Sequence, residues 1–167
     1  DGYYYKPRTD RYDLEKYHED LIVSSACLGG EIPQKILAGD IKGAREAVEW
    51  YHNLFGDDFY LELQRHQVTD PSLHANRETY PLQQQVNKVL TQFAKEYGIK
   101  LICTNDCHFE DKETAEAHDH LLCLSTGKDL DDPTRMRYSK QEWFKTREEM
   151  NDIFQDVPEA LTNTIEI

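Results

Sequence analysis

Residues 99–109 read IKLICTNDCHF, an apolar and largely aliphatic run that leads into polar side chains. The polar part contains Asp106 and His108, two positions apart. Side chains two apart in an extended strand project to the same face. We therefore expect a strand that presents a carboxylate and an imidazole side by side at its end, a combination that suits a divalent metal ion. An isolated D-x-H pattern also fits a turn-capping aspartate followed by an ordinary loop histidine, so the rest of the chain has to decide.

Length and composition indicate a folded domain. The 167 residues, of which 38% are hydrophobic, fit one domain with a sizeable core. The sequence has neither a run of about 20 apolar residues that could span a bilayer nor the apolar centre of a signal peptide. The four cysteines are too sparse for a small disulfide-bonded scaffold. We expect reduced thiols in a cytoplasmic protein.

The net charge of −13 argues against a simple nucleic-acid-binding module. Such an acidic surface repels phosphate backbones. If nucleic acid is the substrate, metal ions or other parts of a larger protein must offset that repulsion.

Hydrophobic periodicity predicts strands and helices in alternation. Strands are expected at 21–25, at 59–64 and along the Asp106 motif, and helices at 10–19, 31–38, 41–55, 81–97, 114–124, 147–154 and 158–167. A polar loop is expected at 67–79, and a polar irregular stretch beyond Gly127. This alternation is typical of an α/β fold with parallel strands.

Candidate ligands follow each predicted strand. Cys27 follows the first, His66 follows the second, and Asp106 and His108 end the third. Functional residues of parallel α/β folds gather at the carboxyl ends of the strands. A metal centre is therefore the favoured interpretation of the three strand ends together.

The alternation within the strands supports this grouping. Leu61 and Leu63 are expected to pack against helices, and the opposite face carries Glu62, Gln64 and His66. By the same argument, the third strand presents Thr104, Asp106 and His108 on one face. A polar inner face with histidines at its rim is costly to bury unless something binds there.

Each candidate also has a plainer interpretation. Cys27 could be a small buried hydrophobic residue, and His66 could simply hydrogen-bond a neighbouring loop. Glu62 could be a ligand, or it could pair with Arg65 or Lys100.

His118 and His120 imitate the H-x-H pair of many metal sites. The surrounding sequence has helical apolar spacing, however, and side chains two apart on a helix point about 200° apart. We expect one of the two histidines to pack against the fold and the other to be solvated.

Six segments together resemble the polymerase-and-histidinol-phosphatase (PHP) domain of the alpha subunit of bacterial DNA polymerase III. They are YYKPR at 4–8, LIVSSACLGGEIPQ at 21–34, YLELQRH at 60–66, IKLICTNDCHF at 99–109, AHDHLLCLSTGKDLDDP at 117–133, and the run from Glu148 through PEALTNTIEI. The resemblance covers nearly the whole chain. It implies the C-terminal part of a PHP domain at 1–130 and an exit segment towards the polymerase palm at 131–167.

The resemblance implies a distorted, here partial, β/α barrel with helices outside and up to three divalent ions, zinc or manganese/magnesium, at the carboxyl ends of its strands. By position, Cys27, His66, Asp106 and His108 match family metal ligands. The family's opening H-x-H strand, a further histidine and an acidic ligand have no counterpart here and are expected upstream of Asp1. With about half of the ligands absent, this chain alone is expected to bind metal weakly and to be nearly inactive.

The leading functional hypothesis is a fragment of the replicative polymerase, a DNA-directed DNA polymerase, with possible 3′–5′ exonuclease activity in its PHP domain. One alternative is a free-standing PHP phosphatase that acts on a small phosphomonoester. Another is a non-catalytic scaffold that docks the proofreading exonuclease. The expected partners are DNA, reached through the rest of the polymerase, and replisome subunits including that exonuclease; no membrane is expected. A half barrel exposes strand edges and apolar surface, so self-association is also expected.

Overall fold

The computed structural model describes residues 3–68 and 78–167. The expected polar loop at 67–79 therefore lies mostly outside the described residues, because its central part, 69–77, is not among them.

A three-stranded parallel sheet forms the centre of the fold. Its strands are β3 (Val23–Ser24), β4 (Phe59–Leu63) and β5 (Leu101–Cys103), in the order β3-β4-β5. Leu61 pairs with Leu101, and both strand pairs are parallel. The predicted α/β class with parallel strands is confirmed at this level, while closure into a barrel stays a prediction.

The helices lie close to the ranges expected from periodicity. They are α1 (Arg11–Tyr17), α2 (Glu31–Leu37), α3 (Ile41–Phe55), α5 (Tyr80–Tyr97), α6 (Ala115–Thr126), α7 (Arg147–Ile153) and α8 (Pro158–Thr162). In the described parts of the chain, short 3₁₀ segments adjoin α3, α6 and α8, at Gly56–Asp58, Lys112–Thr114 and Asn163–Ile165.

Local capping explains several helix ends. The side chain of Asp10 accepts a hydrogen bond from the amide of Asp13 at 3.0 Å, and that of Asp40 accepts one from Gly43 at 2.9 Å. These bonds satisfy amides that have no partner within the helix. Gly98 ends α5 in a left-handed conformation, with φ of 70°, which a residue without a Cβ adopts readily.

Three expectations about the elements need correction. The third strand ends at Cys103, so Asp106 and His108 lie beyond it, and Asp106 has φ of 47°. A left-handed residue cannot continue a strand, so the same-face argument for Thr104, Asp106 and His108 was wrong. The last expected helix is split into α8 and a 3₁₀ turn. A small antiparallel hairpin, β1 (Tyr3–Tyr4) with β2 (Lys6–Pro7), was not expected.

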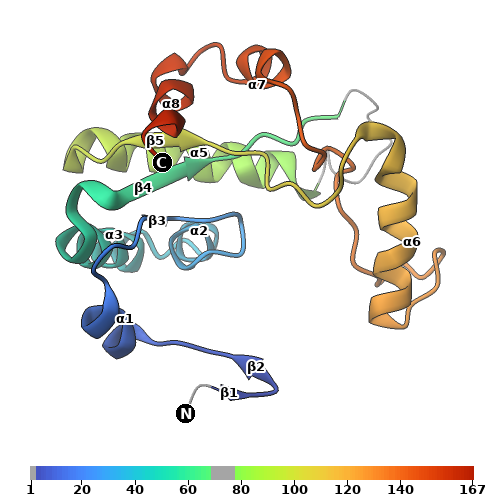
Figure 1. Cartoon of the computed structure of the whole chain (residues 1–167), viewed down its shortest axis with the longest axis horizontal. Coiled ribbons are helices and arrows are strands. Elements are labelled where there is room, and N and C mark those ends of the chain that lie inside the picture. The colour runs from blue at the N-terminus through green and yellow to red at the C-terminus, as the bar shows by residue number, and fades with distance from the viewer. Residues whose placement is uncertain (1–2, 69–77) are drawn as a thin grey trace.

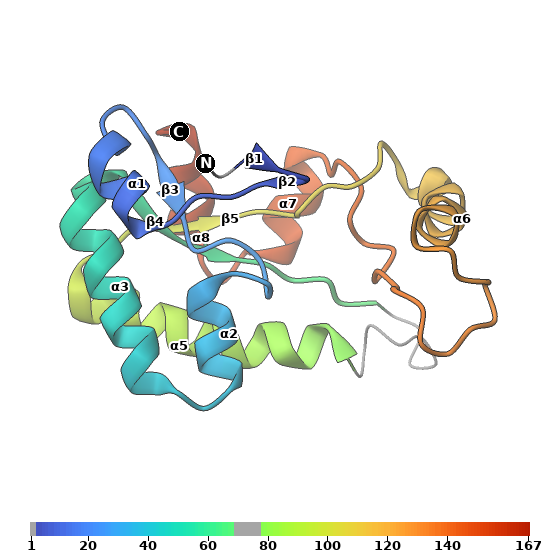
Figure 2. The same cartoon turned by 90° about the horizontal axis from the view of Figure 1, so that it is seen from below.

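The core lies between the sheet and its helices. Figure 1 shows the sheet between α2 and α3 on one side and α7 and α8 on the other, and Figure 2 shows α5 running along the layer of α2 and α3. Leu61, Leu63, Leu90 and Phe93 are each at most 1% exposed. Phe154, after α7, is also 1% exposed and belongs to the same cluster, so the C-terminal segment packs on the core as well.

Helix α6 projects from this body as an arm (Figure 1). Two of its leucines face solvent: Leu121 is 61% exposed and Leu124 is 80% exposed. Its buried side chains are Ala115 and Asp119. Asp119 forms a two-pronged ion pair with Arg135, with distances of 2.6 and 3.0 Å between oxygen and nitrogen. This largely buried ion pair and the ring contact of His118 with Tyr138 therefore hold the arm to the loop that follows it.

No helix in the described parts of the chain combines the length and apolar character needed to cross a bilayer.

Candidate metal centre

A network of polar side chains covers the inner face of β4 and β5. Glu62 accepts hydrogen bonds from Ser24 at 2.5 Å, from Gln64 at 2.9 Å and from the Thr104 hydroxyl. Gln64 also donates to Thr104 at 3.1 Å. The predicted alternation is confirmed here, since Leu61 and Leu63 point into the core. Glu62 is engaged by these neutral donors and pairs with neither of the cations considered for it.

His66 leaves the end of β4 and is 3% exposed. Its Nε2 donates to the carbonyl of Asn105 at 3.0 Å, and its Nδ1 accepts from Gln83 Nε2 at 3.0 Å. The Gln83 carbonyl in turn accepts from the backbone amide of His66 at 2.7 Å. Burial lowers the pKa of His66, although the nearby carboxylate of Glu142 opposes this shift. The ring is therefore neutral, and both of its nitrogens are already bonded to protein.

Asp106 and His108 lie next to each other even though neither is in a strand. Asp106 Oδ1 is 3.5 Å from His108 Nε2, and each side chain is about one third exposed, at 35% and 34%. Among the described residues, neither of these two atoms forms a hydrogen bond, and the contact between them is an ion-pair distance. The predicted proximity holds, but a turn with a positive φ produces it rather than an extended strand.

Cys27 follows β3 and is partly buried. It lines a small cavity together with Glu62, Gln64 and Gln83. Gln83 also hydrogen-bonds the ring of His66. The Gln83 side chain therefore lies between the cavity beside Cys27 and the ring of His66. Within residues 3–68 and 78–167, however, no three His, Cys, Asp or Glu side chains are grouped so that they could hold one ion.

The turn at 139–142 carries a buried carboxylate that the sequence reasoning missed. Glu142 is 2% exposed. Its Oε1 accepts from the amide and hydroxyl of Ser139 at 3.1 and 2.5 Å, and its Oε2 accepts from the amide of Gln141 at 2.9 Å. Glu142 Oε1 also lies 3.4 Å from Nδ1 of His66. The S-x-x-E spacing at 139–142 is the signal that could have revealed this turn.

This turn lies along the Asp106 loop. The carbonyl of Glu142 accepts the amide of His108 at 2.8 Å, and Phe109 forms a parallel bridge with Trp143. Asn105 donates to the carbonyls of Gln141 and Trp143 at 2.8 and 2.7 Å. Segments more than 30 residues apart thus hold the candidate ligands in place.

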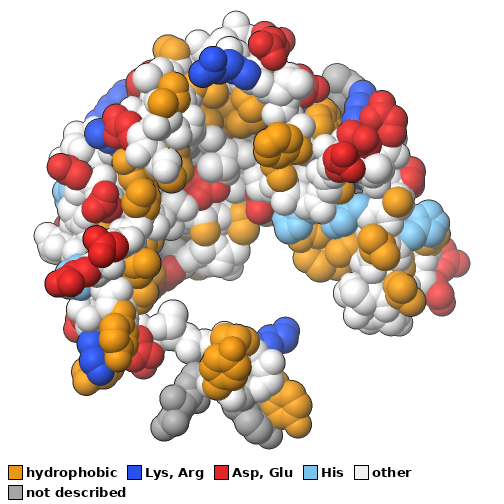
Figure 3. Space-filling view, viewed as in Figure 1, with side chains coloured by type: hydrophobic (Ala, Val, Ile, Leu, Met, Phe, Trp, Pro, Cys, Tyr) orange, Lys and Arg blue, Asp and Glu red, His pale blue; other side chains and the backbone are white. Residues whose placement is uncertain are grey.

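Aromatic rings surround His108. Its ring centroid is 4.5 Å from that of Tyr138 and 5.8 Å from that of His118, and His118 also contacts Phe109 at 5.1 Å. His120 is exposed, as expected for the solvated member of the H-x-H pair. In Figure 3, histidine side chains gather where the α6 arm meets the body, next to the hollow between the arm and the N-terminal hairpin.

Burial and charge tune the groups near this site. Burial raises the pKa of Tyr138, and the negative charges of Asp106 and Glu142 add to the increase. Burial lowers the pKa of Lys145 to about 8, against the opposing effect of Glu149 and Glu142. The Lys145 ammonium also lies 3.2 Å from the ring centroid of Trp143.

Comparisons with known proteins agree with the resemblance seen in the sequence. Residues 1–66 match the family model described as PHP domain. The chain is 42% identical to the DNA polymerase III subunit alpha of Borreliella burgdorferi over 168 aligned residues, which cover 100% of this chain and 14% of that protein. For the Campylobacter jejuni subunit the identity is 41%, with coverage of 99% and 14%. For the Thermus aquaticus subunit it is 39%, with coverage of 100% and 13%.

Over its whole length, the chain is similar to a segment of DNA polymerase III alpha subunits. The predicted relationship to the PHP domain and to these subunits is confirmed. The chain spans about one seventh of the length of these alpha subunits. The family match covers β3 and β4 with the helices between them and ends at His66, while the Asp106 motif follows it. The proposed boundary at residue 130 stays a prediction.

Proposed function

We propose that this chain is part of a replicative DNA polymerase III alpha subunit and that Asp106 and His108 bind a divalent metal ion in its PHP domain. Similarity to the alpha subunits over the whole chain supports the first statement. One observation supports the second statement: a carboxylate oxygen and an imidazole nitrogen lie 3.5 Å apart, and neither atom has a hydrogen-bond partner among the described residues.

The separation fits a shared ion. Two ligand bonds of about 2.1 Å at a tetrahedral angle place their atoms about 3.4 Å apart. The pair is also accessible, since about one third of each side chain is exposed. Carboxylate and neutral imidazole suit zinc and manganese, and carboxylate suits magnesium, so the choice among these ions stays open.

His66 and Cys27 are the other proposed ligands, although neither is grouped with Asp106 and His108 around one ion among the described residues, and His66 carries a further requirement. His66 can offer Nδ1 to an ion only if Gln83 releases it, because Gln83 now donates to that nitrogen. Its Nε2 can keep the bond to the Asn105 carbonyl. Such an outer bond fixes the tautomer and orientation of a ligating histidine. Cys27 borders the same glutamine.

In this proposal the protein groups position the site, and further ligands come from other parts of the polymerase. A divalent ion supplies Lewis acidity and lowers the pKa of a coordinated water. Asn105 and the carbonyl of Glu142 hold the loop that carries both ligands. The substrate class is a phosphodiester at a DNA 3′ end, and the partners are DNA and other replisome subunits of the bacterial cytoplasm. The acidic surface is then compensated by metal ions and by the rest of the polymerase.

Metal binding by the intact alpha subunit tests the proposal. Asp106→Asn and His108→Gln should each weaken manganese or zinc binding, measured by calorimetry and metal analysis, by about 10-fold or more, since even outer-shell changes cost 10–100-fold. His120→Gln is the matched control, because this histidine of α6 is exposed and its Nδ1 bonds the Glu116 carbonyl rather than a candidate ligand. Unchanged stoichiometry and affinity in both site variants would refute the proposed ligands. Retained 3′ exonuclease activity in both would refute the catalytic role.

A non-catalytic scaffold is the second candidate. The engagement of both His66 ring nitrogens by protein favours it, since a histidine that is bonded at both nitrogens does not need a metal ion. The two proposals differ in what Gln83→Ala does. A metal site should bind ions at least as tightly once Nδ1 is freed, whereas a scaffold should only lose stability.

A further inference from the structure

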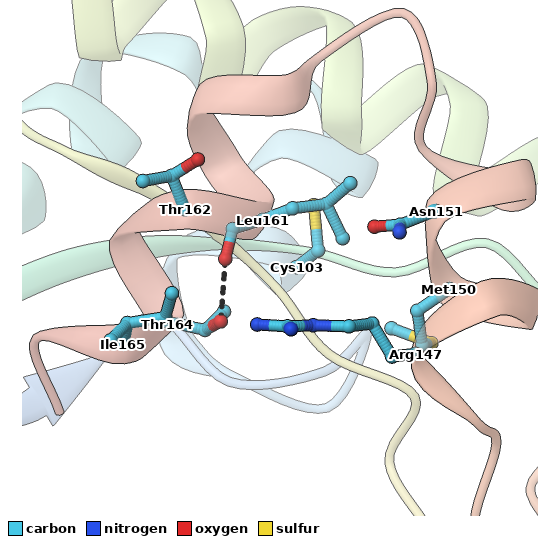
Figure 4. A pocket seen from close by; sticks show the side chains of 8 residues that line it. All are labelled: Cys103, Arg147, Met150, Asn151, Leu161, Thr162, Thr164 and Ile165. Carbon is cyan, nitrogen blue, oxygen red and sulfur yellow. Dashed lines mark hydrogen bonds between the residues drawn. The ribbon is translucent and has the colours of Figure 1, made fainter.

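A separate cleft of about 490 Å³ opens between β5, α7 and the end of α8 (Figure 4). It is lined by Cys103, Arg147, Met150, Asn151, Leu161, Thr162, Thr164 and Ile165. Its volume lies within the range of small-molecule sites, and none of its lining residues is a candidate metal ligand.

Arg147 is the cationic residue of this lining. Figure 4 shows its side chain extending from α7 across the cleft towards Thr164. Four other arginines pair with carboxylates, namely Arg11, Arg45, Arg65 and Arg135. The structure describes no ion pair or hydrogen bond for Arg147. The chain has a net charge of −13, yet no described carboxylate pairs with this guanidinium. Because the guanidinium faces a cavity, it can bind an anion there.

The remaining lining adds one amide and an apolar wall. The hydroxyls of Thr162 and Thr164 donate to the backbone carbonyls of Pro158 and Leu161 at 3.1 and 2.6 Å, so their protons are already used. Asn151 has no described hydrogen-bond partner and points towards the centre of the cleft (Figure 4). Met150, Leu161 and Ile165 supply apolar surface.

The floor of the cleft is uncharged. Cys103 is 5% exposed, and burial raises the pKa of its thiol to about 12. The thiol therefore stays protonated and does not compete for the guanidinium of Arg147. Besides burial, the positive charge of Arg65 lowers the pKa of this thiol, and the negative charges of Asp156 and Glu159 raise it.

We propose that this cleft binds a carboxylate carried on a small apolar body. A guanidinium matches a carboxylate with two parallel hydrogen bonds, and Arg147 can neutralise one negative charge. Because Arg147 is the single charged side chain of the described lining, the cleft matches one negative charge rather than the two or more of a phosphate. The apolar wall accommodates an aliphatic or aromatic group next to the carboxylate.

Ligand-observed saturation-transfer NMR on the purified full chain tests this proposal, with 3-phenylpropionate as the probe. The wild type should bind the probe, and Arg147→Gln should weaken binding about 10-fold or more, as expected for the loss of a charge-assisted bidentate contact. The uncharged 3-phenylpropionamide should bind as weakly to the wild type as the acid does to the variant. Arg137→Gln is the control, since this arginine has no carboxylate partner and lies outside the cleft.

A second probe identifies the source of the carboxylate. N-acetyl-Ala-Ala-Phe carries the same group at the end of a peptide; tighter binding than 3-phenylpropionate identifies a polypeptide C-terminus, and weaker binding identifies a free acid. Thermal unfolding of Arg147→Gln should match that of the wild type, because Arg147 makes no described contact. The proposal fails if the wild type does not bind either probe at millimolar concentration, if Arg147→Gln binds as well as the wild type, or if the amide binds as well as the acid.

Discussion

Replacing Glu142 by alanine should destabilise the protein strongly and loosen the candidate metal centre. The Glu142 side chain accepts hydrogen bonds from the amide and hydroxyl of Ser139 and from the amide of Gln141. Ser139 is 2% exposed, so water cannot replace the lost acceptor for its two donors. Each buried donor left without a partner costs about 1–3 kcal/mol. The Gln141 amide adds less to the cost, because it also donates to the Ser139 hydroxyl at 3.1 Å.

We expect the free energy of unfolding to fall by about 3–5 kcal/mol, a loss typical of substitutions that break a buried hydrogen-bond network. Urea unfolding followed by circular dichroism measures it at pH 7. Glu148→Ala is the matched control, since this exposed glutamate on α7 should change stability by less than about 0.5 kcal/mol. Glu142→Gln should fall between the two, because its amide keeps one acceptor oxygen.

The site itself offers a second measurement. The backbone amide of His108 donates to the carbonyl of Glu142 at 2.8 Å, so loosening the turn should speed hydrogen exchange at His108. A loss below about 1 kcal/mol for Glu142→Ala would show that the buried carboxylate does not organise this turn. Unchanged exchange at His108 would break the link between the turn and the Asp106 loop.

Three further predictions follow from the same contacts. The pKa of Lys145 is about 8 in the folded protein and has its ordinary value near 10.5 in the unfolded chain. Between these two pH values the unfolded chain therefore binds more protons than the folded one. Lys145 thus makes the free energy of unfolding rise with pH across this window. The melting temperature of Lys145→Met should rise less over the same range, and equal slopes would contradict the shifted lysine. Iodoacetamide at pH 8 should label the exposed Cys107 well before Cys103, whose pKa is about 12; equal labelling in peptide mass spectrometry would show that the Cys103 thiol is accessible. Asp119→Ala leaves Arg135 without its carboxylate partner. It should lower the free energy of unfolding by about 3 kcal/mol and speed hydrogen exchange along α6. A loss of unfolding free energy under about 0.5 kcal/mol would mean that other contacts hold the arm.

Sequence patterns predicted much of the fold because they depend on local rules. Helix α3 begins and ends where its cap and its glycine indicate, and the alternation along β4 correctly separates Leu61 and Leu63 from Glu62 and Gln64. The resemblance to the PHP domain also came from short motifs in a fixed order, and the comparisons agree with it. Periodicity was less reliable on α6, whose leucines face solvent while Asp119 is buried.

The sequence by itself determined the α/β class, the positions of the helices and the juxtaposition of Asp106 with His108, because these follow from spacing over a few residues. Tertiary structure alone decided what surrounds them. The position of Glu142 next to His66, the role of Gln83 towards His66 and the place of Arg147 in its cleft depend on segments that are 17 to more than 50 residues apart in the chain. Local sequence patterns do not predict such contacts, because the packing of the whole fold determines which distant residues meet. For the same reason the left-handed Asp106, rather than an extended strand, brings the two candidate ligands together.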